Sequence, residues 1–218
     1  MHTQSLKIFV SDSVGSVSAK YIAPDEPRWI VTLAHGAGAG MNHSFMDALA
    51  HSLAAVSIAT LRFNFPFSEK GKGRPDQPAI AHATIAAAIA SAGQLRPELP
   101  LFVAGKSFGG RMSSQYLAAH PDDRIRGLIF YGFPLHPAGK PGTDRSDHLQ
   151  LLQIPMFFLQ GTKDALATWP LIETVCRSLP TASLVGLEGV DHSFRNGRAD
   201  IISRLTEETA KWVNEVAR

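Results

Sequence analysis

Short runs of apolar and β-branched residues alternate along this chain with stretches in which apolar residues recur at helical spacing. Apolar runs bounded by turn residues are typical of strands, and a repeat of about 3.6 residues is typical of helices. The alternation of the two predicts an α/β fold, a mostly parallel sheet with helices on both faces. The predicted strands are Leu6–Val10, Val17–Ile22, Trp29–Leu33, Ser57–Phe63, Leu101–Ala104, Gly127–Tyr131, Pro155–Leu159 and Ser183–Leu187.

The predicted strands from Trp29 onward are continuous apolar runs, so we expect each to be buried on both faces, as in a parallel sheet. Three apolar stripes at helical spacing predict core contacts: Phe45, Leu49 and Leu53; Ile85, Ile89 and Ala92; Ile202, Leu205, Trp212 and Val216. Clusters of proline and glycine at Pro66–Pro78 and Pro134–Gly142 predict loops within the domain.

Length and composition limit the classes of protein that this chain can join. Its 218 residues are expected to form a single domain over residues 1–218. A net charge of +2 without a basic segment argues against nucleic acid as a partner. The N-terminus lacks a signal-like apolar run, and no run reaches the roughly 18 apolar residues of a membrane span. Cys176 is the single cysteine and cannot form an internal disulfide, so a reducing compartment is expected. Together these features predict a cytoplasmic protein that is not bound to a membrane.

The segment Gly105-Lys106-Ser107-Phe108-Gly109 lies between a predicted strand and a predicted helix. In that context G-x-S-x-G predicts a nucleophile elbow, a sharp turn that holds a serine in a strained conformation above the sheet. Glycines two residues before and after the serine allow the strand and the helix to approach each other closely. We therefore expect Ser107 to be a nucleophile.

Two nucleotide-binding motifs compete with this interpretation. Gly105-Lys106-Ser107 resembles the end of a phosphate-binding loop, but Pro100 occupies the place of that motif's first glycine, and an apolar strand fills the space between. The glycine-rich segment from His35 to Gly40 also follows a strand, as a dinucleotide fingerprint does, but Met41 stands where the last glycine is needed. Both motifs are disfavoured, and no cofactor or metal is expected.

A serine nucleophile needs a base to accept its proton and an acid to orient that base. Asp164 follows the strand PMFFLQ, and His192 follows the strand SLVGLEGV, so both are expected at the same edge of the sheet as Ser107. Taken alone, Asp164 could cap the following helix and His192 could be an ordinary loop histidine. Asp191 is a competing acid, although adjacent side chains in extended backbone point apart. Together the three positions predict Ser107 as nucleophile, Asp164 as acid and His192 as base.

Backbone amides are expected to stabilise the oxyanion of such a reaction. The amide after the nucleophile belongs to Phe108, and Ala37 in the glycine-rich loop is the predicted source of the second. Four residues near the first central strands are candidates for the pocket wall, with structural hydrogen bonding as the alternative for the side chains: His35, Gly36, His43 and Asn64. Four basic residues either attract an anionic substrate or are simply solvated: Lys70, Lys72, Arg74 and Lys106.

The segments HGAGAG, LRFNFPF, GKSFGGR, GTKD and DHSF resemble those of small alpha/beta hydrolases related to dienelactone hydrolase, and among these the predicted hydrolases similar to testis-expressed protein thirty. The resemblance runs from about Trp29 to the final helix. It implies the alpha/beta-hydrolase fold with an eight-stranded, mostly parallel sheet, and it maps Ser107, Asp164 and His192 onto the family's triad. Dienelactone hydrolase has a cysteine where this chain has Ser107, so its lactone substrate is not implied.

The expected function is that of a cofactor-free serine hydrolase, carboxylesterase-like, which cleaves an ester or related acyl bond of a small-molecule substrate. Only Phe133–Gln153 separates two predicted strands where larger relatives insert a lid, so no large lid domain is expected, and short acyl groups are favoured. A hydrolase-like scaffold for protein partners, and an acyltransferase or peptidase with the same triad, are the alternatives. The sequence leaves open whether copies associate into a homo-oligomer.

Overall fold

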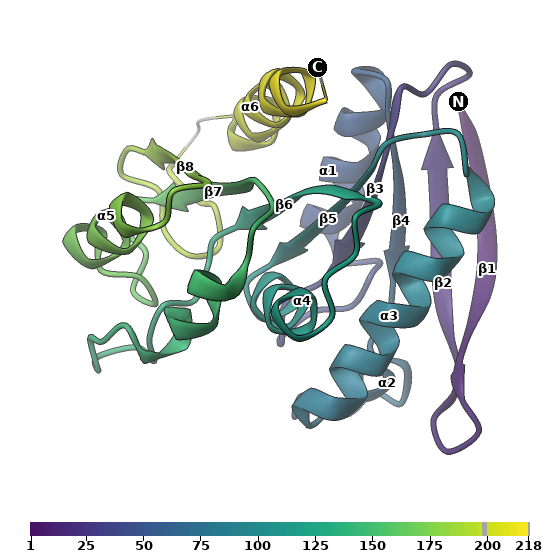
Figure 1. The fold of residues 1–218 in the computed structure, drawn as a ribbon, viewed down its shortest axis with the longest axis horizontal. Coiled ribbons are helices and arrows are strands. Elements are labelled where there is room, and N and C mark those ends of the chain that lie inside the picture. Colours follow the sequence, from purple (N-terminus) through teal and green to yellow (C-terminus); the bar gives the residue numbers. More distant parts are fainter. Residues whose placement is uncertain (198–199, 218) are drawn as a thin grey trace.

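The computed structural model describes residues 1–197 and 200–217, which contain one eight-stranded sheet in the order β1-β2-β4-β3-β5-β6-β7-β8 (Figure 1). Every pair of neighbours from β4 across to β8 is parallel, and β2 runs antiparallel to both of its neighbours. The predicted strands all fall on observed ones: β1 (His2–Ser11), β2 (Gly15–Ala23), β3 (Trp29–Ala34), β4 (Ile58–Phe63), β5 (Leu101–Lys106), β6 (Ile125–Tyr131), β7 (Met156–Gly161) and β8 (Ala182–Leu187).

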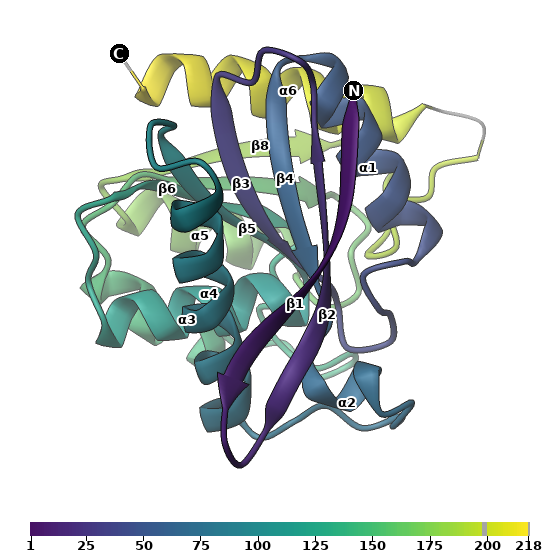
Figure 2. The same ribbon diagram turned by 90° about the vertical axis from the view of Figure 1, so that its right-hand side faces the viewer.

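Helices cover both faces of this sheet, as the alternating pattern predicted (Figure 1). On one face lie α1 (Ser44–Ala55) and α6 (Ile201–Val216). On the other lie α3 (Pro78–Leu95), α4 (Phe108–Ala119) and α5 (Trp169–Ser178). Figure 2 shows the long β1–β2 hairpin at one edge of the sheet.

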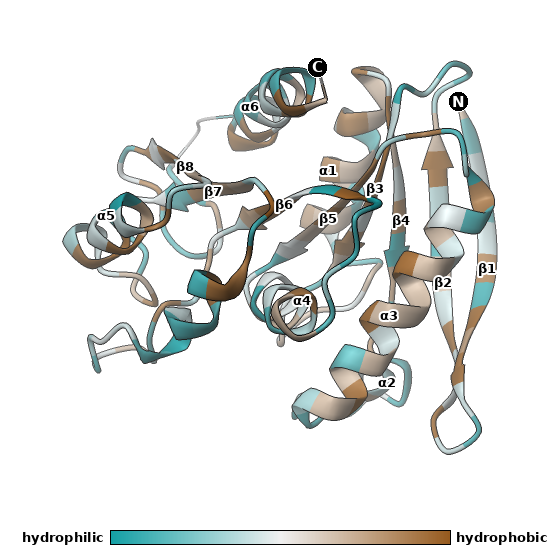
Figure 3. Cartoon of the chain, viewed as in Figure 1, coloured by the Kyte–Doolittle hydropathy of each residue, from teal (hydrophilic) through white to brown (hydrophobic). Residues whose placement is uncertain are grey.

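The residues of β5 show how one strand contributes to two cores. Leu101 and Val103 pack into the cluster that contains α3 and α4, whereas Phe102 and Ala104 pack into the cluster that contains α1 and α6. Successive side chains of a strand point to opposite faces, so a strand covered on both sides needs apolar residues at nearly every position. Helix α3 also carries hydrophobic colouring over most of its length in Figure 3.

Two local expectations were wrong. Strand β8, which contains the predicted strand Ser183–Leu187, is not buried on both faces: it is an edge strand with only β7 as neighbour, and most of its residues are partly exposed. The predicted loop Pro66–Pro78 contains the one-turn helix α2 (Pro66–Glu69), which starts at a proline. Proline suits a first helical position because its fixed φ is already helical and no amide hydrogen is needed there.

The connection between β6 and β7 contains only a short 3₁₀ helix, η1 (Asp144–Leu151). The part of the chain that the structure describes therefore has no lid domain. Within the same residues, none of the helices combines the length and the apolar character needed to cross a bilayer. The carboxyl ends of the parallel strands, where ligands bind in open α/β sheets, are not covered by an inserted domain.

Candidate active site

Ser107 lies at the turn between β5 and α4, with φ 51° and ψ −115°. This backbone conformation is rare for a residue with a side chain, and the surrounding structure must hold it in place. A methyl group on Gly105 would come within 2.2 Å of the Gly110 nitrogen, and one on Gly109 within 2.6 Å of the Ala34 carbonyl oxygen. Both flanking positions of the motif therefore require glycine, because strand and helix are in direct backbone contact.

The side chains of Ser107, His192 and Asp164 form one hydrogen-bonded chain. The Ser107 Oγ lies 2.8 Å from His192 Nε2, and His192 Nδ1 lies 2.7 Å from Asp164 Oδ2. Asp164 comes from the turn after β7 and its side chain is fully buried, whereas the His192 side chain, from the loop after β8, is 22% exposed. With Nδ1–H donating to the carboxylate, Nε2 is free to accept the serine proton. This arrangement can activate a hydroxyl.

Gln160, the second-last residue of β7, hydrogen-bonds to the buried carboxylate of Asp164. Its Nε2 donates to Asp164 Oδ2 at 2.6 Å, while its Oε1 accepts the backbone N–H of Phe133 at 2.8 Å. The backbone N–H of Leu166 donates to Asp164 Oδ1 at 2.7 Å. Sequence reasoning missed Gln160, although a lone amide in the apolar strand MFFLQG is a usable signal: a buried polar group needs partners.

The competing assignments for the acid do not fit these contacts. Asp191 Oδ1 accepts hydrogen bonds from the backbone amides of Ser193 and Arg195, both at 2.9 Å, so its carboxylate is bonded within its own loop. Helix α5 begins at Trp169 after the cap residue Thr168, so Asp164 does not cap it. Asp164 is the carboxylate that contacts the imidazole.

A cleft of about 700 Å³ opens over Ser107 and His192. Its walls come from the glycine-rich loop after β3, from the first half of α1 and from the start of α6. A methyl group on Gly36 would lie 3.6 Å from the Ser107 Cβ, so this loop passes directly beside the nucleophile candidate. Ala37 lies in the cleft wall, and Phe108 opens α4, where first-turn amides have no acceptor within the helix.

Two of the four predicted pocket residues line this cleft, and two do not. Gly36 and His43 belong to the wall. His35 is fully buried beneath it: its Nδ1–H donates to the Gly36 carbonyl at 2.8 Å, and its Nε2 accepts the Phe65 amide at 3.1 Å. Burial, partly offset by the bond to the Gly36 carbonyl, lowers the pKa of His35 to about 4. The imidazole is therefore neutral and structural, as the alternative interpretation held.

Asn64 also lies outside the cleft wall, although it was a predicted pocket residue. Its Oδ1 accepts the Met41 amide at 2.8 Å, and its Nδ2 donates to Glu69 Oε2 at 2.8 Å. These bonds join the end of the glycine-rich loop to α2, so Asn64 supports the loop without facing a ligand.

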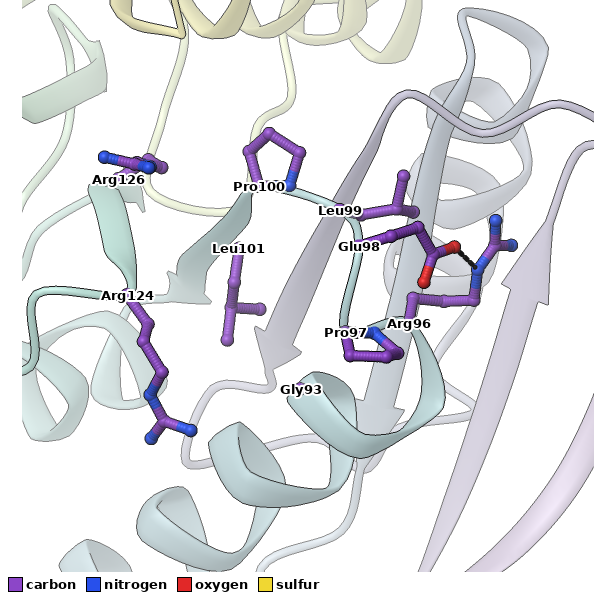
Figure 4. A pocket seen from close by; sticks show the side chains of 9 residues that line it. All are labelled: Gly93, Arg96, Pro97, Glu98, Leu99, Pro100, Leu101, Arg124 and Arg126. Atoms are coloured by element: carbon purple, nitrogen blue, oxygen red, sulfur yellow. Dashed lines mark hydrogen bonds and ion pairs between the residues drawn. The ribbon is translucent and has the colours of Figure 1, made fainter.

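A second hollow, of about 380 Å³, lies at the opposite end of the sheet, where β5 and β6 begin (Figure 4). Its charged side chains are Glu98, which is paired with Arg96 at 2.6 Å, and the arginines Arg124 and Arg126. The nine labelled residues include no hydroxyl, thiol or imidazole group. This hollow therefore offers no nucleophile, unlike the cleft that is lined by Ser107 and His192.

The alpha/beta hydrolase domain family matches residues 27–217, and the chain belongs to this family. Several solved structures share its fold. A serine hydrolase homologue from Coxiella burnetii is 21% identical, with 98% of each chain covered and a TM-score of 0.78. A serine hydrolase without a lid from Xanthomonas campestris is 23% identical, with 97% of this chain and 95% of that one covered and a TM-score of 0.75.

Dienelactone hydrolase from Anabaena variabilis is 17% identical, with 99% of each chain covered and a TM-score of 0.75. Its presence among these neighbours confirms the resemblance to dienelactone hydrolase that the sequence motifs indicated. The narrower likeness to testis-expressed protein thirty stays a prediction.

Proposed function

We propose that this chain is a serine hydrolase that cleaves an ester or a related acyl bond through an acyl-enzyme on Ser107. The observation that carries the proposal is the chain of hydrogen bonds from the Ser107 hydroxyl through His192 to the buried Asp164, at the floor of an open cleft. Membership of the alpha/beta hydrolase domain family supports hydrolytic chemistry. A protein that served only as a scaffold would need none of these contacts.

In the acylation half-reaction, the Ser107 Oγ attacks the substrate carbonyl carbon while its proton passes to His192 Nε2. The C=O π pair moves onto the oxygen to form a tetrahedral oxyanion. When the oxyanion collapses, the bond to the leaving group breaks and the protonated imidazole gives its proton to the departing alcohol. Asp164 stabilises the imidazolium through the 2.7 Å bond to Nδ1 and keeps Nε2 turned toward the serine.

In the second half-reaction, a water molecule attacks the acyl carbon and gives its proton to His192 Nε2. The second tetrahedral intermediate then expels the Ser107 oxygen, which takes the proton back. The acid product leaves, and the free hydroxyl is restored, so no external reductant, metal or cofactor enters the balance. A different acceptor in place of water would make the same site an acyltransferase.

We assign the backbone amides of Phe108 and Ala37 to the oxyanion. The first lies next to the nucleophile in the first turn of α4, and the second lies in the loop that passes beside Ser107. Amides in fixed positions stabilise developing negative charge without having to reorganise, and one such donor is worth about 10²- to 10³-fold in kcat.

We propose small, soluble esters with short acyl groups as the substrates. The cleft is open and has no lid among the described residues, and its apolar wall includes Phe45, Ala48 and Phe194. Such a wall accommodates an acyl or alcohol group of limited size, because walls without a cover leave the far end of a long chain in water.

Hydrolysis of p-nitrophenyl acetate by the purified protein tests the proposal. The expected result is turnover that falls at least about 10³-fold in Ser107→Ala, since the nucleophile is lost. Ser193→Ala is the matched control, because Ser193 also lines the cleft but has no part in the proposed chemistry. A wild-type protein without turnover on any of a panel of acyl esters and amides would favour the scaffold instead.

A further inference from the structure

Lys106 is the last residue of β5 and directly precedes Ser107. From the sequence it is either a charge that attracts an anionic substrate or a solvated lysine. Its Nζ instead donates a hydrogen bond to the backbone carbonyl oxygen of His192, at 2.5 Å. The same ammonium lies 4.9 Å from the centre of the Phe194 ring, a cation–π distance. The other predicted basic residues, Lys70, Lys72 and Arg74, are exposed and lie outside the cleft wall.

The loop that Lys106 contacts has several hydrogen bonds of its own, and the residue at its start, Val190, accepts the backbone amide of Lys163 at 3.0 Å. The Asp191 carboxylate accepts two amides of this loop, and the Phe194 amide donates to the Asp191 carbonyl. Phe194 has a φ of 59°, rare for a residue of its size, and its ring stacks on Phe45 of α1 at 5.4 Å. Lys106 adds a link from this loop to the end of β5, next to the hydrogen bond between His192 and Ser107.

We propose that Lys106 is a positioning residue, which ties the loop of the base to the strand that carries the nucleophile. This inference rests on the proposed function. Two hydrogen bonds from consecutive residues then set the position of His192 relative to the nucleophile. The Ser107 hydroxyl bonds to the His192 ring, and the Lys106 ammonium donates to the His192 backbone carbonyl. Two consecutive residues, Lys106 at the end of β5 and Ser107 in the turn after it, thereby contact the backbone and the side chain of His192. The ammonium acts through His192 and not on the reacting atoms.

The surroundings of the ammonium make this link sensitive to alkaline pH. Burial lowers the pKa of Lys106 to about 8, although the carboxylates of Asp164 and Asp191 oppose the shift. These acids come from the turn after β7 and the loop after β8, and the His192 ring lies on the same loop. Among the described residues, the other charged groups on the cleft wall are Arg195 and Asp200. Deprotonation of Lys106 converts a charge-assisted hydrogen bond into a weaker neutral one.

The test compares three variants under steady-state conditions. Lys106→Met keeps the length of the side chain but removes the donor, Lys106→Arg keeps a cationic donor, and Lys211→Met makes the same change at an exposed position on α6. Because small displacements of catalytic groups can cost about a hundredfold, we expect Lys106→Met to lower kcat by about ten- to a hundredfold with KM within about twofold of wild type. Lys106→Arg should recover at least part of that loss, and Lys211→Met should match wild type.

The pH profile separates positioning from a merely structural role. Wild-type kcat should step down above pH about 8, and this step should be absent in Lys106→Met, which has nothing to deprotonate. Titration of Lys106 does not itself unfold the protein, because the unfolded lysine keeps its proton to higher pH than the folded one. The contribution of Lys106 to stability therefore rises with pH above about 8. If Lys106→Met does not fold, the inference is still tested by the pH profile of the wild-type protein and by the kcat of Lys106→Arg.

Two results would overturn the inference. One is a Lys106→Met variant with wild-type kcat and the same alkaline step. The other is a variant whose KM rises only for esters that carry a carboxylate while kcat is unchanged, which would make Lys106 a substrate-binding group. The proposed hydrolase function fails separately, if the wild-type protein neither turns over esters nor reacts with a fluorophosphonate.

Discussion

At the residue scale, the carboxylate of Asp164 accepts from three donors: the imidazole of His192, the amide of Gln160 and the backbone of Leu166. An asparagine in its place has only one oxygen, so at least one of these donors would face an NH₂ group. We predict that Asp164→Asn lowers kcat by about 10²- to 10⁴-fold while the fold is kept, because tautomer control and imidazolium stabilisation are lost. Steady-state ester hydrolysis with circular dichroism checks both parts.

Asp191→Asn is the matched control for this substitution. The Asp191 oxygen that accepts two loop amides has an equivalent in asparagine, so activity should stay within about threefold of wild type. A severe loss in Asp191→Asn with little loss in Asp164→Asn would assign the acid to the wrong residue.

The three side chains that the sequence grouped together are hydrogen-bonded to one another, because each follows the end of a parallel strand and such ends share one edge of the sheet. Their catalytic roles stay a prediction. Sequence reasoning did not find Gln160, which belongs to no motif, or the contact from Lys106 to His192, since Lys106 fills a variable position of the elbow motif and the contact depends on strand order. For His35 the sequence left the pocket wall and a structural hydrogen-bonding role both open, because chain position alone does not tell whether a side chain points into a cleft or into the core; the side chain lies beneath the cleft.

At the scale of elements, the buried imidazole of His35 joins the loop after β3 to the segment that leads into α2. Its pKa of about 4 in the folded protein lies below the unfolded value of about 6.5, so the unfolded chain takes up the proton first as the pH falls. The stabilisation is fully present above pH about 6.5 and is lost toward pH about 4. We predict a loss of about 2 kcal/mol in the free energy of unfolding between pH 7 and pH 5 from this group.

Urea denaturation of wild type and His35→Gln at the two pH values measures that contribution. His148, whose pKa burial also lowers to about 4, acts in the same direction in both proteins, so it cancels in the comparison. The variant should be less stable at pH 7 and should lose less stability on acidification. Equal pH dependence in the two proteins would mean that His35 takes up its proton as readily in the folded protein as in the unfolded chain.

The strands could be predicted because burial on two faces produces continuous apolar runs, as in β3 and β5. The position of a strand in the sheet could not be predicted from such runs. Strand β8 contains Leu184, Val185 and Leu187 but lies at an edge, with β7 as its neighbour in the sheet and α5 packed against it. Helix α2, which lies in a proline-rich segment, was not predicted because a single turn is too short to show a helical repeat.

At the scale of the whole molecule, the open cleft limits how much of a substrate can be buried and so how much of it can contribute to binding. Each buried methylene contributes about 0.8 kcal/mol, but only as far as the walls reach. We predict that kcat/KM stops rising after a few acyl carbons and that the rate does not jump at a lipid interface. A series of p-nitrophenyl esters from acetate to palmitate, assayed below and above the critical micelle concentration, measures both. A rate that keeps rising to long chains would indicate a hydrophobic tunnel or a cover over the cleft.

Covalent labelling is the most direct test of Ser107 as the nucleophile. The protein is incubated with a fluorophosphonate, digested, and the modified peptide is identified by mass spectrometry. We predict a single phosphonate adduct, on Ser107, in the wild type and in Ser193→Ala. The adduct should form faster in these two proteins than in Asp164→Asn. Ser107→Ala should carry no adduct. Labelling that persists undiminished in Ser107→Ala, or an adduct on another serine, would contradict the account.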